Sequence, residues 1–373
     1  MKHPETLFPA KLLLFGEYSI LLGSEALSMP FFSFSAALRF GKSTTRESFG
    51  FAQDSLMTSV KVPPLNYDLK PDSVKAGLAG LAATSNEQLR KFYFHFIENR
   101  SIFAEIIDLE FFNHELDRGL FLESNIPQRY GMGSSGALCA ALYDRYRLDV
   151  TFQKNRHIRS EIMDQSPVGE NLTWQEQTLI NDPEKLVVLQ SVFISMESFF
   201  HGRSSGFDPM VSFLKTPLLF RSDGNISQVD LQALADVENN VKILLIDSCS
   251  HGATAPLVND FLVKFLPGGY ISAGGENFRR LTNKCISSLF DVNPESIYSA
   301  ISQLSHFQLT ELSHLVPSHL QSAWSEGLQT GLFSLKLCGS GGGGFLLCFT
   351  HNEAMTLSYF NKLNIPVIPV QLS

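Results

Sequence analysis

The sequence is organised around residues 127–142, which read P-Q-R-Y-G-M-G-S-S-G-A-L-C-A-A-L. Gly131 and Gly133 permit positive φ angles and let the backbone approach a ligand closely. Ser134 or Ser135 is a natural N-cap for a helix over the apolar residues that follow. The N-terminus of such a helix presents free N–H groups and the positive end of its dipole to an anion, usually phosphate. The stretch therefore indicates either a phosphate-binding turn or an ordinary capped helix after a tight turn.

The same letters spell G-x-G-x-x-G, the dinucleotide-binding fingerprint, but their context argues against that function. The fingerprint needs a strand that runs directly into the first glycine. Here residues 124–130 intervene with a proline and several polar side chains. We therefore expect no nicotinamide dinucleotide site at this turn.

Length and composition predict a compact globular protein of two domains. The chain has 373 residues, which exceeds the usual size of a single hydrophobic core. Hydrophobic residues make up 44% of the sequence and charged residues 18%, so little of it suits long disorder. The formal net charge of -8 argues against nucleic-acid binding, which favours a basic surface. Any bound phosphate must therefore be held by local groups.

The cysteines and the apolar segments indicate a cytoplasmic protein. The five cysteines are odd in number, far apart and mostly in apolar surroundings, without a C-x-x-C pair. We expect them to be reduced core residues. The N-terminus lacks the apolar segment of a signal peptide, and no window approaches 18 uncharged apolar residues. These features predict neither a signal peptide nor a membrane span.

Lys11 is the first candidate site residue along the chain. Residues 7–18 predict a short apolar strand that carries this one lysine and ends at Gly16-Glu17. A lysine in a buried strand is uncommon because its ammonium must find a partner. Lys11 is therefore either a substrate or phosphate contact, or an edge lysine whose ammonium reaches water.

The segments that follow show alternating and helical patterns without evident chemistry. Residues 26–40 and 49–62 predict antiparallel strands, and residues 74–96 predict a helix. Residues 103–112, followed by residues 119–123, indicate a further hairpin.

Two carboxylates, Glu197 and Asp208, lie on either side of a break between helical segments. Residues 185–200 predict a helix that ends at Gly202, and a serine-rich turn then restarts the chain. If the two helical segments are joined at Gly202, both carboxylates can point into one cleft. One of them could then bind a metal ion and the other could act as a general base. The alternative is that they are caps or solvated charges at helix ends.

A competing signal overlaps this break. Residues 202–206 fit G-x-S-x-G, the nucleophile elbow of α/β-hydrolases, with Ser204 as nucleophile and Asp247 and His314 following in the expected order. The elbow demands a strand directly before its first glycine, whereas the preceding spacing predicts a helix. A serine hydrolase is therefore the alternative from a different class.

The C-terminal part predicts a second domain that begins at residue 237. A strand over residues 241–247 precedes helical segments, which cover residues 255–265, 276–290, 294–315 and 319–330. Residues 335–349 then predict two apolar strands joined by five glycines and a serine, and a short helix and a strand over residues 365–372 end the chain. This order is typical of an antiparallel α+β sandwich. The glycine run favours close approach to a ligand over packing, because ordering it costs backbone entropy.

Three separated segments resemble the motifs of the GHMP small-molecule kinases, in order and suitably spaced. They are Pro9-Ala10-Lys11 through Gly16-Glu17, then Gly131 through Ser135, then Lys336 through Gly344. Within that superfamily, Glu197, His201-Gly202, Ser205-Gly206 and Asp208 most resemble the mevalonate kinase pattern. The resemblance implies two domains, residues 1–236 like domain 2 of ribosomal protein S5 and residues 237–373 ferredoxin-like, with ATP and Mg²⁺ as cofactors.

The resemblance also implies a role for each matching residue. It makes Asp208 the catalytic base, Lys11 its charged neighbour, and Ser135 and Glu197 the magnesium ligands. The implied nucleotide-binding residues are Gly131, Met132, Gly133, Ser134, Ser135 and Gly136. The implied substrate-binding residues are Glu17, Tyr18, His201, Thr254, Gly339, Ser340 and Gly341.

Departures from the family pattern leave the acceptor open. Mevalonate kinases usually have His where Tyr18 follows Glu17, and Gly-Glu-Tyr is more familiar from phosphomevalonate kinases. The expected acceptor is a small hydroxylated acid, mevalonate first, with phosphomevalonate and sugar or heptose substrates as alternatives. A nucleotide-binding regulator without catalysis is disfavoured because Lys11, Glu197 and Asp208 occur together. The oligomeric state is open, with a homodimer as one alternative, and neither a nucleic-acid nor a membrane partner is expected.

Overall fold

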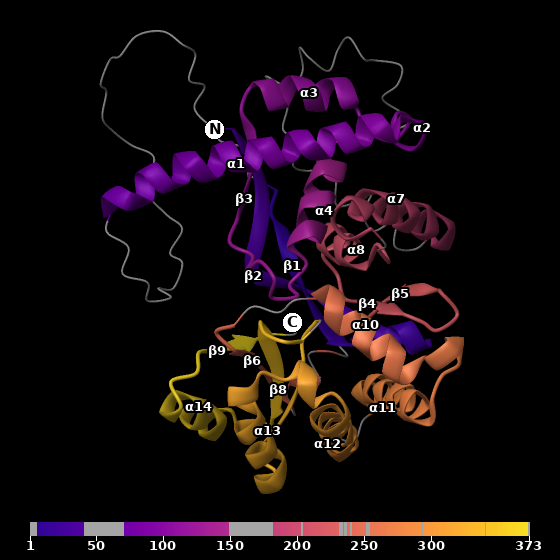
Figure 1. The fold of residues 1–373 in the computed structure, drawn as a ribbon, viewed down its shortest axis with the longest axis vertical. Coiled ribbons are helices and arrows are strands. Elements are labelled where there is room, and N and C mark those ends of the chain that lie inside the picture. The colour runs from indigo at the N-terminus through magenta and orange to yellow at the C-terminus, as the bar shows by residue number, and fades with distance from the viewer. Residues whose placement is uncertain are drawn as a thin grey trace. The chain divides into compact units, whose positions relative to one another are not determined.

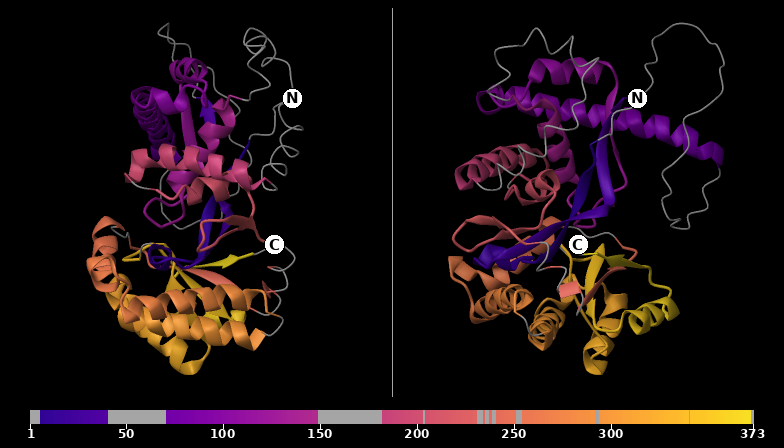
Figure 2. Two further views of the ribbon diagram at one scale, coloured as in Figure 1. Left: turned by 90° about the vertical axis from the view of Figure 1, so that its right-hand side faces the viewer. Right: turned by 180° about the vertical axis from the view of Figure 1, so that it is seen from behind.

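The computed structural model is a mixed α and β fold with two sheets (Figures 1 and 2). It describes residues 6–40, 71–148, 182–202, 204–230, 234, 237–238, 241–250, 254–291, 294–339 and 341–371. The chain forms two compact units. The first comprises Met1–Ala36, Ser124–Ala141 and Pro167–Ser373, and the second Ala37–Glu123 and Leu142–Ser166. The predicted strand over residues 49–62 lies outside the described residues.

The first sheet has the order β1-β2-β4-β5, with β3 paired to β2. Its strands are β1 (Phe8–Phe15), β2 (Ala26–Phe40), β3 (Leu120–Ser124), β4 (Leu218–Phe220) and β5 (Ile226–Gln228). The strand β1 pairs antiparallel with β2, with irregular register between Pro9 and Ala10 and again between Leu13 and Phe15. After β1 the chain turns through the short helix η1 (Ser19–Leu22). The predicted strands over residues 7–18 and 26–40 are therefore confirmed.

Three helices that begin in or lie within the first unit carry predicted site residues. They are α4 (Ser134–Tyr146), whose first half belongs to this unit, α7 (Pro183–His201) and α8 (Phe207–Leu214). Helix α7 begins with Asp182, whose side chain accepts from the Lys185 N–H, and ends at Gly202 with a φ of 70°. The helix, the break at Gly202 and the restart into α8 confirm the predicted arrangement, and α8 lies beside α7 (Figure 1).

The second sheet has the order β7-β8-β6-β9 and is antiparallel throughout. Its strands are β6 (Lys242–Asp247), β7 (Phe333–Leu337), β8 (Phe345–Thr350) and β9 (Val367–Val370). The helices of this region are α10 (Thr254–Phe265), α11 (Ala273–Leu289), α12 (Pro294–Glu311), α13 (Ser318–Thr330) and α14 (Glu353–Lys362), with short turns η3 (Pro267–Gly269) and η4 (Ser313–Leu315). Helices α12 and α13 pack against β7. This element order confirms the predicted antiparallel α+β arrangement.

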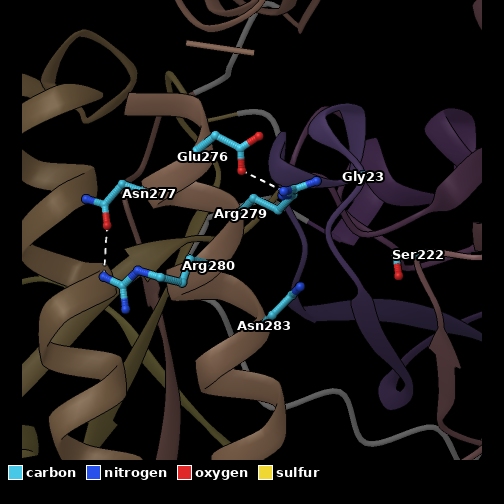
Figure 3. Close-up of a pocket in the computed structure, with 7 residues that line it drawn as sticks. All are labelled: Gly23, Ser222, Glu276, Asn277, Arg279, Arg280 and Asn283. Atoms are coloured by element: carbon cyan, nitrogen blue, oxygen red, sulfur yellow. Dashed lines mark hydrogen bonds and ion pairs between the residues drawn. The ribbon is translucent and has the colours of Figure 1, made fainter. Parts of the chain in front are cut away.

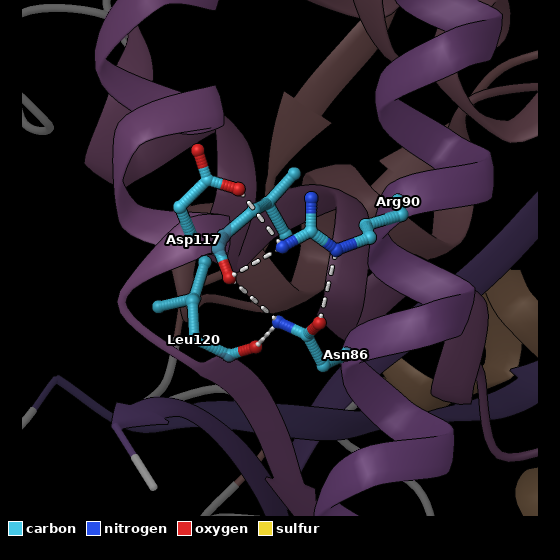
Figure 4. Close-up of polar contacts among 5 residues, drawn as sticks. Asn86, Arg90, Asp117 and Leu120 are labelled. Atoms are coloured by element: carbon cyan, nitrogen blue, oxygen red, sulfur yellow. Dashed lines mark hydrogen bonds and ion pairs between the residues drawn. The ribbon is translucent and has the colours of Figure 1, made fainter. Parts of the chain in front are cut away.

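The second unit contains α1 (Pro71–Glu98), α2 (Arg100–Phe103) and α3 (Leu109–Asp117). Side chains of α1 bind the end of α3: Asn86 donates to the carbonyls of Leu116 and Leu120, and Arg90 donates to Leu116 and Asp117 (Figure 4). These contacts tie α1 to the last turn of α3, at Leu116 and Asp117, and to the start of β3, at Leu120.

The predicted hairpin over residues 103–112 and 119–123 is wrong in its first half. Asp108 caps α3, because its carboxylate accepts from the Phe111 N–H at 3.0 Å. Leu109, Phe112 and Leu116 then fall on one buried helical face, with spacings of three and four residues. The run of apolar residues by itself resembles a strand, but the Asp108 cap makes residues 109–117 helical.

Four of the five cysteines, Cys139, Cys285, Cys338 and Cys348, are buried free thiols, as expected for core residues. The expectation was wrong for Cys249, whose free thiol is exposed. Within the described part of the chain, no helix is both long and apolar enough to cross a membrane.

Candidate active site

Lys11 and Asp208 form an ion pair between β1 and the first turn of α8. The Lys11 Nζ lies 2.9 Å from the Asp208 Oδ1, and the two side chains are 9% and 26% exposed. Burial lowers the pKa of Lys11, but Asp208 opposes this effect, and the net shift is upward from the ordinary value. The ammonium therefore stays charged. The family resemblance implies these two residues as neighbours, and the structure brings them together.

The turn at residues 131–133 packs directly on this ion pair. The Lys11 N–H donates to the Met132 carbonyl at 3.0 Å. A Cβ at Gly133 would lie 2.7 Å from the Lys11 Cγ, and a Cβ at Gly136 would lie 2.7 Å from the Asp208 Cβ and backbone carbonyl carbon. Both distances are shorter than real contacts, so only glycine allows the start of α4 to approach Lys11 and Asp208 this closely. The helix begins at Ser134, and its N-terminal turn therefore lies beside a buried cation and a carboxylate.

Glu197 is the second carboxylate of the site and is only 3% exposed. Its Oε1 accepts from the Ser135 Oγ at 3.3 Å, and its Oε2 accepts a short hydrogen bond from the Ser204 Oγ. Burial, reinforced by the negative charge of Asp208, raises the pKa of Glu197 from 4.5 to about 7. The predicted metal-ligand pair of Ser135 and Glu197 is thus brought together by α4 and α7.

The raised pKa of Glu197 predicts a loss of stability as the pH rises. A folded-state pKa of about 7, against an ordinary 4.5, means that the folded protein binds this proton more tightly than the unfolded chain. The free energy of unfolding should therefore fall by up to roughly 3 kcal/mol as the pH rises through this window, and then level off. Urea unfolding of the metal-free protein at closely spaced pH values measures how the free energy of unfolding depends on pH. Glu197→Gln should reduce this dependence, and identical pH profiles for the two proteins would contradict the raised pKa of Glu197.

The glycine-rich loop between β7 and β8 packs on the turn before α4. A Cβ at Gly131 would lie 3.0 Å from the Cys338 carbonyl oxygen and 3.1 Å from the Gly339 Cα. A Cβ at Gly344 would likewise lie 2.9 Å from the Tyr130 Cα. Several of these glycines are therefore required by the contact between two chain segments. The expectation that ligand approach alone explains the glycine run was incomplete, because the partner segment lies some 200 residues away along the chain.

Glu17 and Tyr18, two predicted substrate-binding residues, are both buried. Glu17 is 4% exposed and accepts from the Lys336 Nζ in a short ion pair. Burial raises the pKa of Glu17, and the Lys336 ammonium opposes that rise. Tyr18 has a φ of 58°, and its ring packs on Phe261 of α10 with centroids 4.8 Å apart. The part of the site that these two residues occupy is therefore closely packed.

Lys336 was not predicted as a functional residue, although the signal was present. Its side chain has no exposed surface, and its Nζ also donates to the Leu337 carbonyl at 2.6 Å. The sequence shows one lysine in a strongly apolar strand, which is the same signal that identified Lys11. In the family resemblance, Lys336 counts only as the first residue of the third motif.

Three predicted site residues lie partly or wholly outside the described positions. Ser340 is not among the described residues, and the side chains of His201 and Thr254 are likewise outside them. The backbone places His201 at the end of α7 and Thr254 at the start of α10.

The segment around Gly202 lacks the architecture of a nucleophile elbow. Helix α7, not a strand, leads into Gly202, and the Ser204 hydroxyl donates to Glu197. An elbow needs a strand at this position so that its serine is held at the top of a sheet. The serine hydrolase alternative was therefore wrong about the element that precedes this turn.

A separate cavity of about 710 Å³ opens beside α11 (Figure 3). It is lined by Gly23, Ser222, Glu276, Asn277, Arg279, Arg280 and Asn283. Arg279 is paired with Glu276 at 2.6 Å, and Arg280 donates to Asn277 at 2.9 Å. None of the lining residues is a predicted site residue.

Comparison with known proteins finds likeness in structure alone. No protein-family model and no curated protein sequence matches the chain. The mevalonate kinase of Methanococcus jannaschii is 16% identical with a TM-score of 0.57, over 100% of this chain and 99% of that one. The phosphomevalonate kinase of Streptococcus pneumoniae, in complex with phosphomevalonate and AMPPNP, is 15% identical with a TM-score of 0.51, over 98% and 100%. The galactokinase of Lactococcus lactis, complexed with galactose, is 11% identical with a TM-score of 0.51, over 98% and 92%.

These structures share one architecture across three kinases with different named substrates. Each match extends over nearly the whole of both chains. The chain therefore has the α+β fold of the GHMP kinases.

Proposed function

We propose that this protein is an ATP-dependent kinase that phosphorylates the hydroxyl group of a small acid, with mevalonate as the leading acceptor. The observation that carries the proposal is the ion pair of Lys11 and Asp208 beside the glycine turn that opens α4. A phosphoryl-transfer site needs a phosphate cradle, a positive charge and a proton acceptor within one small region. The mevalonate kinase pattern from Glu197 to Asp208 supports this acceptor.

Each residue of the pair has a distinct role in the proposed reaction. The Asp208 carboxylate accepts the proton of the acceptor hydroxyl as that oxygen attacks the terminal phosphate of ATP. Lys11 holds the Asp208 carboxylate in place through their ion pair and offsets negative charge on the transferring group. The N–H groups at the start of α4 face the phosphates and need not reorganise during transfer.

Ser135 and Glu197 form a donor set that fits Mg²⁺. This ion prefers oxygen ligands and is usually held by one or two carboxylates together with substrate phosphates. A hydroxyl and a carboxylate 3.3 Å apart, next to the proposed phosphate cradle, meet that requirement. Held by these two residues together with ATP, Mg²⁺ would offset the negative charge of the phosphates.

Removal of either donor should weaken Mg²⁺ binding and so raise the magnesium requirement of turnover. Ser135→Ala and Glu197→Gln should each raise the Mg²⁺ concentration for half-maximal turnover at least about tenfold, with unchanged circular dichroism. Glu184→Gln is the matched control, because Glu184 is exposed in the first turn of the same helix. A normal magnesium requirement in both site variants would remove them from the metal site.

The acceptor has one specific rival. Tyr18 departs from the mevalonate kinase pattern towards that of phosphomevalonate kinases, and both kinds of kinase share this fold. An ATP-consumption screen over mevalonate, phosphomevalonate, galactose, homoserine and heptose phosphates decides between them. Turnover with mevalonate supports the leading proposal, and turnover only with phosphomevalonate supports the rival. Tight ATP binding without turnover of any acceptor would instead indicate a nucleotide-binding regulator.

The domain division that we propose follows the same family. Residues 1–236 would form the N-terminal kinase domain and residues 237–373 the C-terminal domain. The first sheet falls within the former range and the second sheet within the latter.

A further inference from the structure

Ser204 holds one oxygen of the Glu197 carboxylate. The Ser204 Oγ accepts from the Gly206 N–H at 3.0 Å, so its own proton is free to point elsewhere. It points to the Glu197 Oε2, with which it forms a short hydrogen bond. A hydroxyl has a single proton, and this geometry assigns it to the carboxylate.

The loop that carries Ser204 is fixed on α7, the helix that carries Glu197. Gln190 donates from its side chain to the Ser205 carbonyl at 3.0 Å. Gly206 has a φ of 69°, and a Cβ there would lie 2.8 Å from the Gln190 carbonyl oxygen. The loop and the helix therefore lie close together, and the Ser204 hydroxyl reaches Glu197 beside this contact.

The two oxygens of Glu197 have different partners. Oε1 accepts from the Ser135 Oγ at 3.3 Å, and Oε2 accepts from the Ser204 Oγ. Because the Ser204 oxygen is itself bound by the Gly206 N–H, Oε2 is held by this loop, whereas Oε1 lies on the side of Ser135 and the start of α4.

We propose that Ser204 is a positioning residue that fixes the Glu197 carboxylate with Oε1 turned towards Ser135 and the bound Mg²⁺. The inference rests on the proposed function, since it assigns a role within the same site. Without Ser204, Oε2 would lose its donor in a buried position and the carboxylate could rotate. Partners of this kind orient a metal ligand without touching the metal.

Three variants test the proposal. Ser204→Ala removes the donor, Ser204→Thr retains a hydroxyl, and Ser191→Ala removes an exposed hydroxyl of α7 that donates to the Val187 carbonyl. The probe is Mn²⁺, whose dissociation constant is measured by electron paramagnetic resonance on the full-length protein saturated with AMPPNP. AMPPNP affinity without a divalent cation is measured in parallel, because it reports the phosphate cradle alone.

Ser204→Ala should weaken Mn²⁺ binding about tenfold, within the usual range for such partners, and leave metal-free AMPPNP affinity unchanged. Ser204→Thr should restore Mn²⁺ affinity, and Ser191→Ala should match the wild type. A merely structural role would instead lower both affinities together. Equal Mn²⁺ affinity in Ser204→Ala and wild type would overturn the role of Ser204 while leaving the kinase proposal intact. A wild-type protein that binds neither AMPPNP nor Mn²⁺ would overturn both.

Discussion

Asp208→Asn should still bind ATP and should lose on the order of 10²- to 10⁴-fold in turnover, the usual contribution of a general base. Asparagine keeps the shape of the side chain but cannot accept the proton of the acceptor hydroxyl. Lys11 would also lose its ionic partner at 2.9 Å, although its ammonium could still bind phosphate. Steady-state turnover with the acceptor found in the screen measures catalysis, and calorimetry measures ATP affinity. The two measurements together distinguish a loss of catalysis from a loss of ATP binding.

The control for this variant is Asp223→Asn, because the Asp223 carboxylate lies in an exposed turn and accepts from the Asn225 N–H and side chain. That change should leave turnover as in the wild type. If Asp208→Asn also keeps near wild-type turnover, the base assignment is wrong. Lys11 and the start of α4 would then have to lower the barrier by positioning and charge alone.

Local patterns in the sequence predicted most of the elements correctly. The strands at both ends, helix α7, the break at Gly202 and the glycine loop between β7 and β8 all lie where apolar periodicity and glycines placed them. These features depend on neighbours within a few residues. The wrong prediction at residues 103–112 also concerns a local feature: the Asp108 cap starts a helix at Leu109, whereas the apolar run alone resembles a strand.

The candidate site was harder to predict because its contacts join distant segments. The pairing of Lys11 with Asp208 was expected from a family pattern and not from spacing. The contact of Gly136 with Asp208 explains why this helix needs a glycine there, and no local rule predicts it. Similarly, the G-x-S-x-G pattern makes Ser204 a candidate nucleophile, whereas in the structure its hydroxyl donates to Glu197.

The buried pair of Glu17 and Lys336 joins residues that are 319 positions apart in the sequence. Its two side chains are 2% and 0% exposed, so neither charge can be solvated by water if its partner is lost. Lys336→Met and Glu17→Gln should therefore each lower the free energy of unfolding by about 3–5 kcal/mol, the usual cost of an unpaired buried charge. An exposed pair is the matched control: Glu276→Gln, which removes the partner of Arg279, should cost at most about 1 kcal/mol.

The double variant Glu17→Gln/Lys336→Met tests whether the single losses come from the uncompensated charge. It removes both charges and leaves the Leu337 carbonyl without the Lys336 donor, so its cost should be only about 1–3 kcal/mol, less than the two single losses combined. Urea unfolding of all four members of the cycle measures this coupling.

The Glu17–Lys336 pair also bears on the point where β7 ends and the glycine loop begins, because Lys336 donates to the Leu337 carbonyl. The Leu337 N–H in turn donates to Gln308 at 2.8 Å. Hydrogen exchange in that loop should accelerate in each single variant and less in the double variant. Additive losses with unchanged exchange would mean that Glu17 and Lys336 act separately, and Glu17 would then be free to serve the substrate as the family pattern implies.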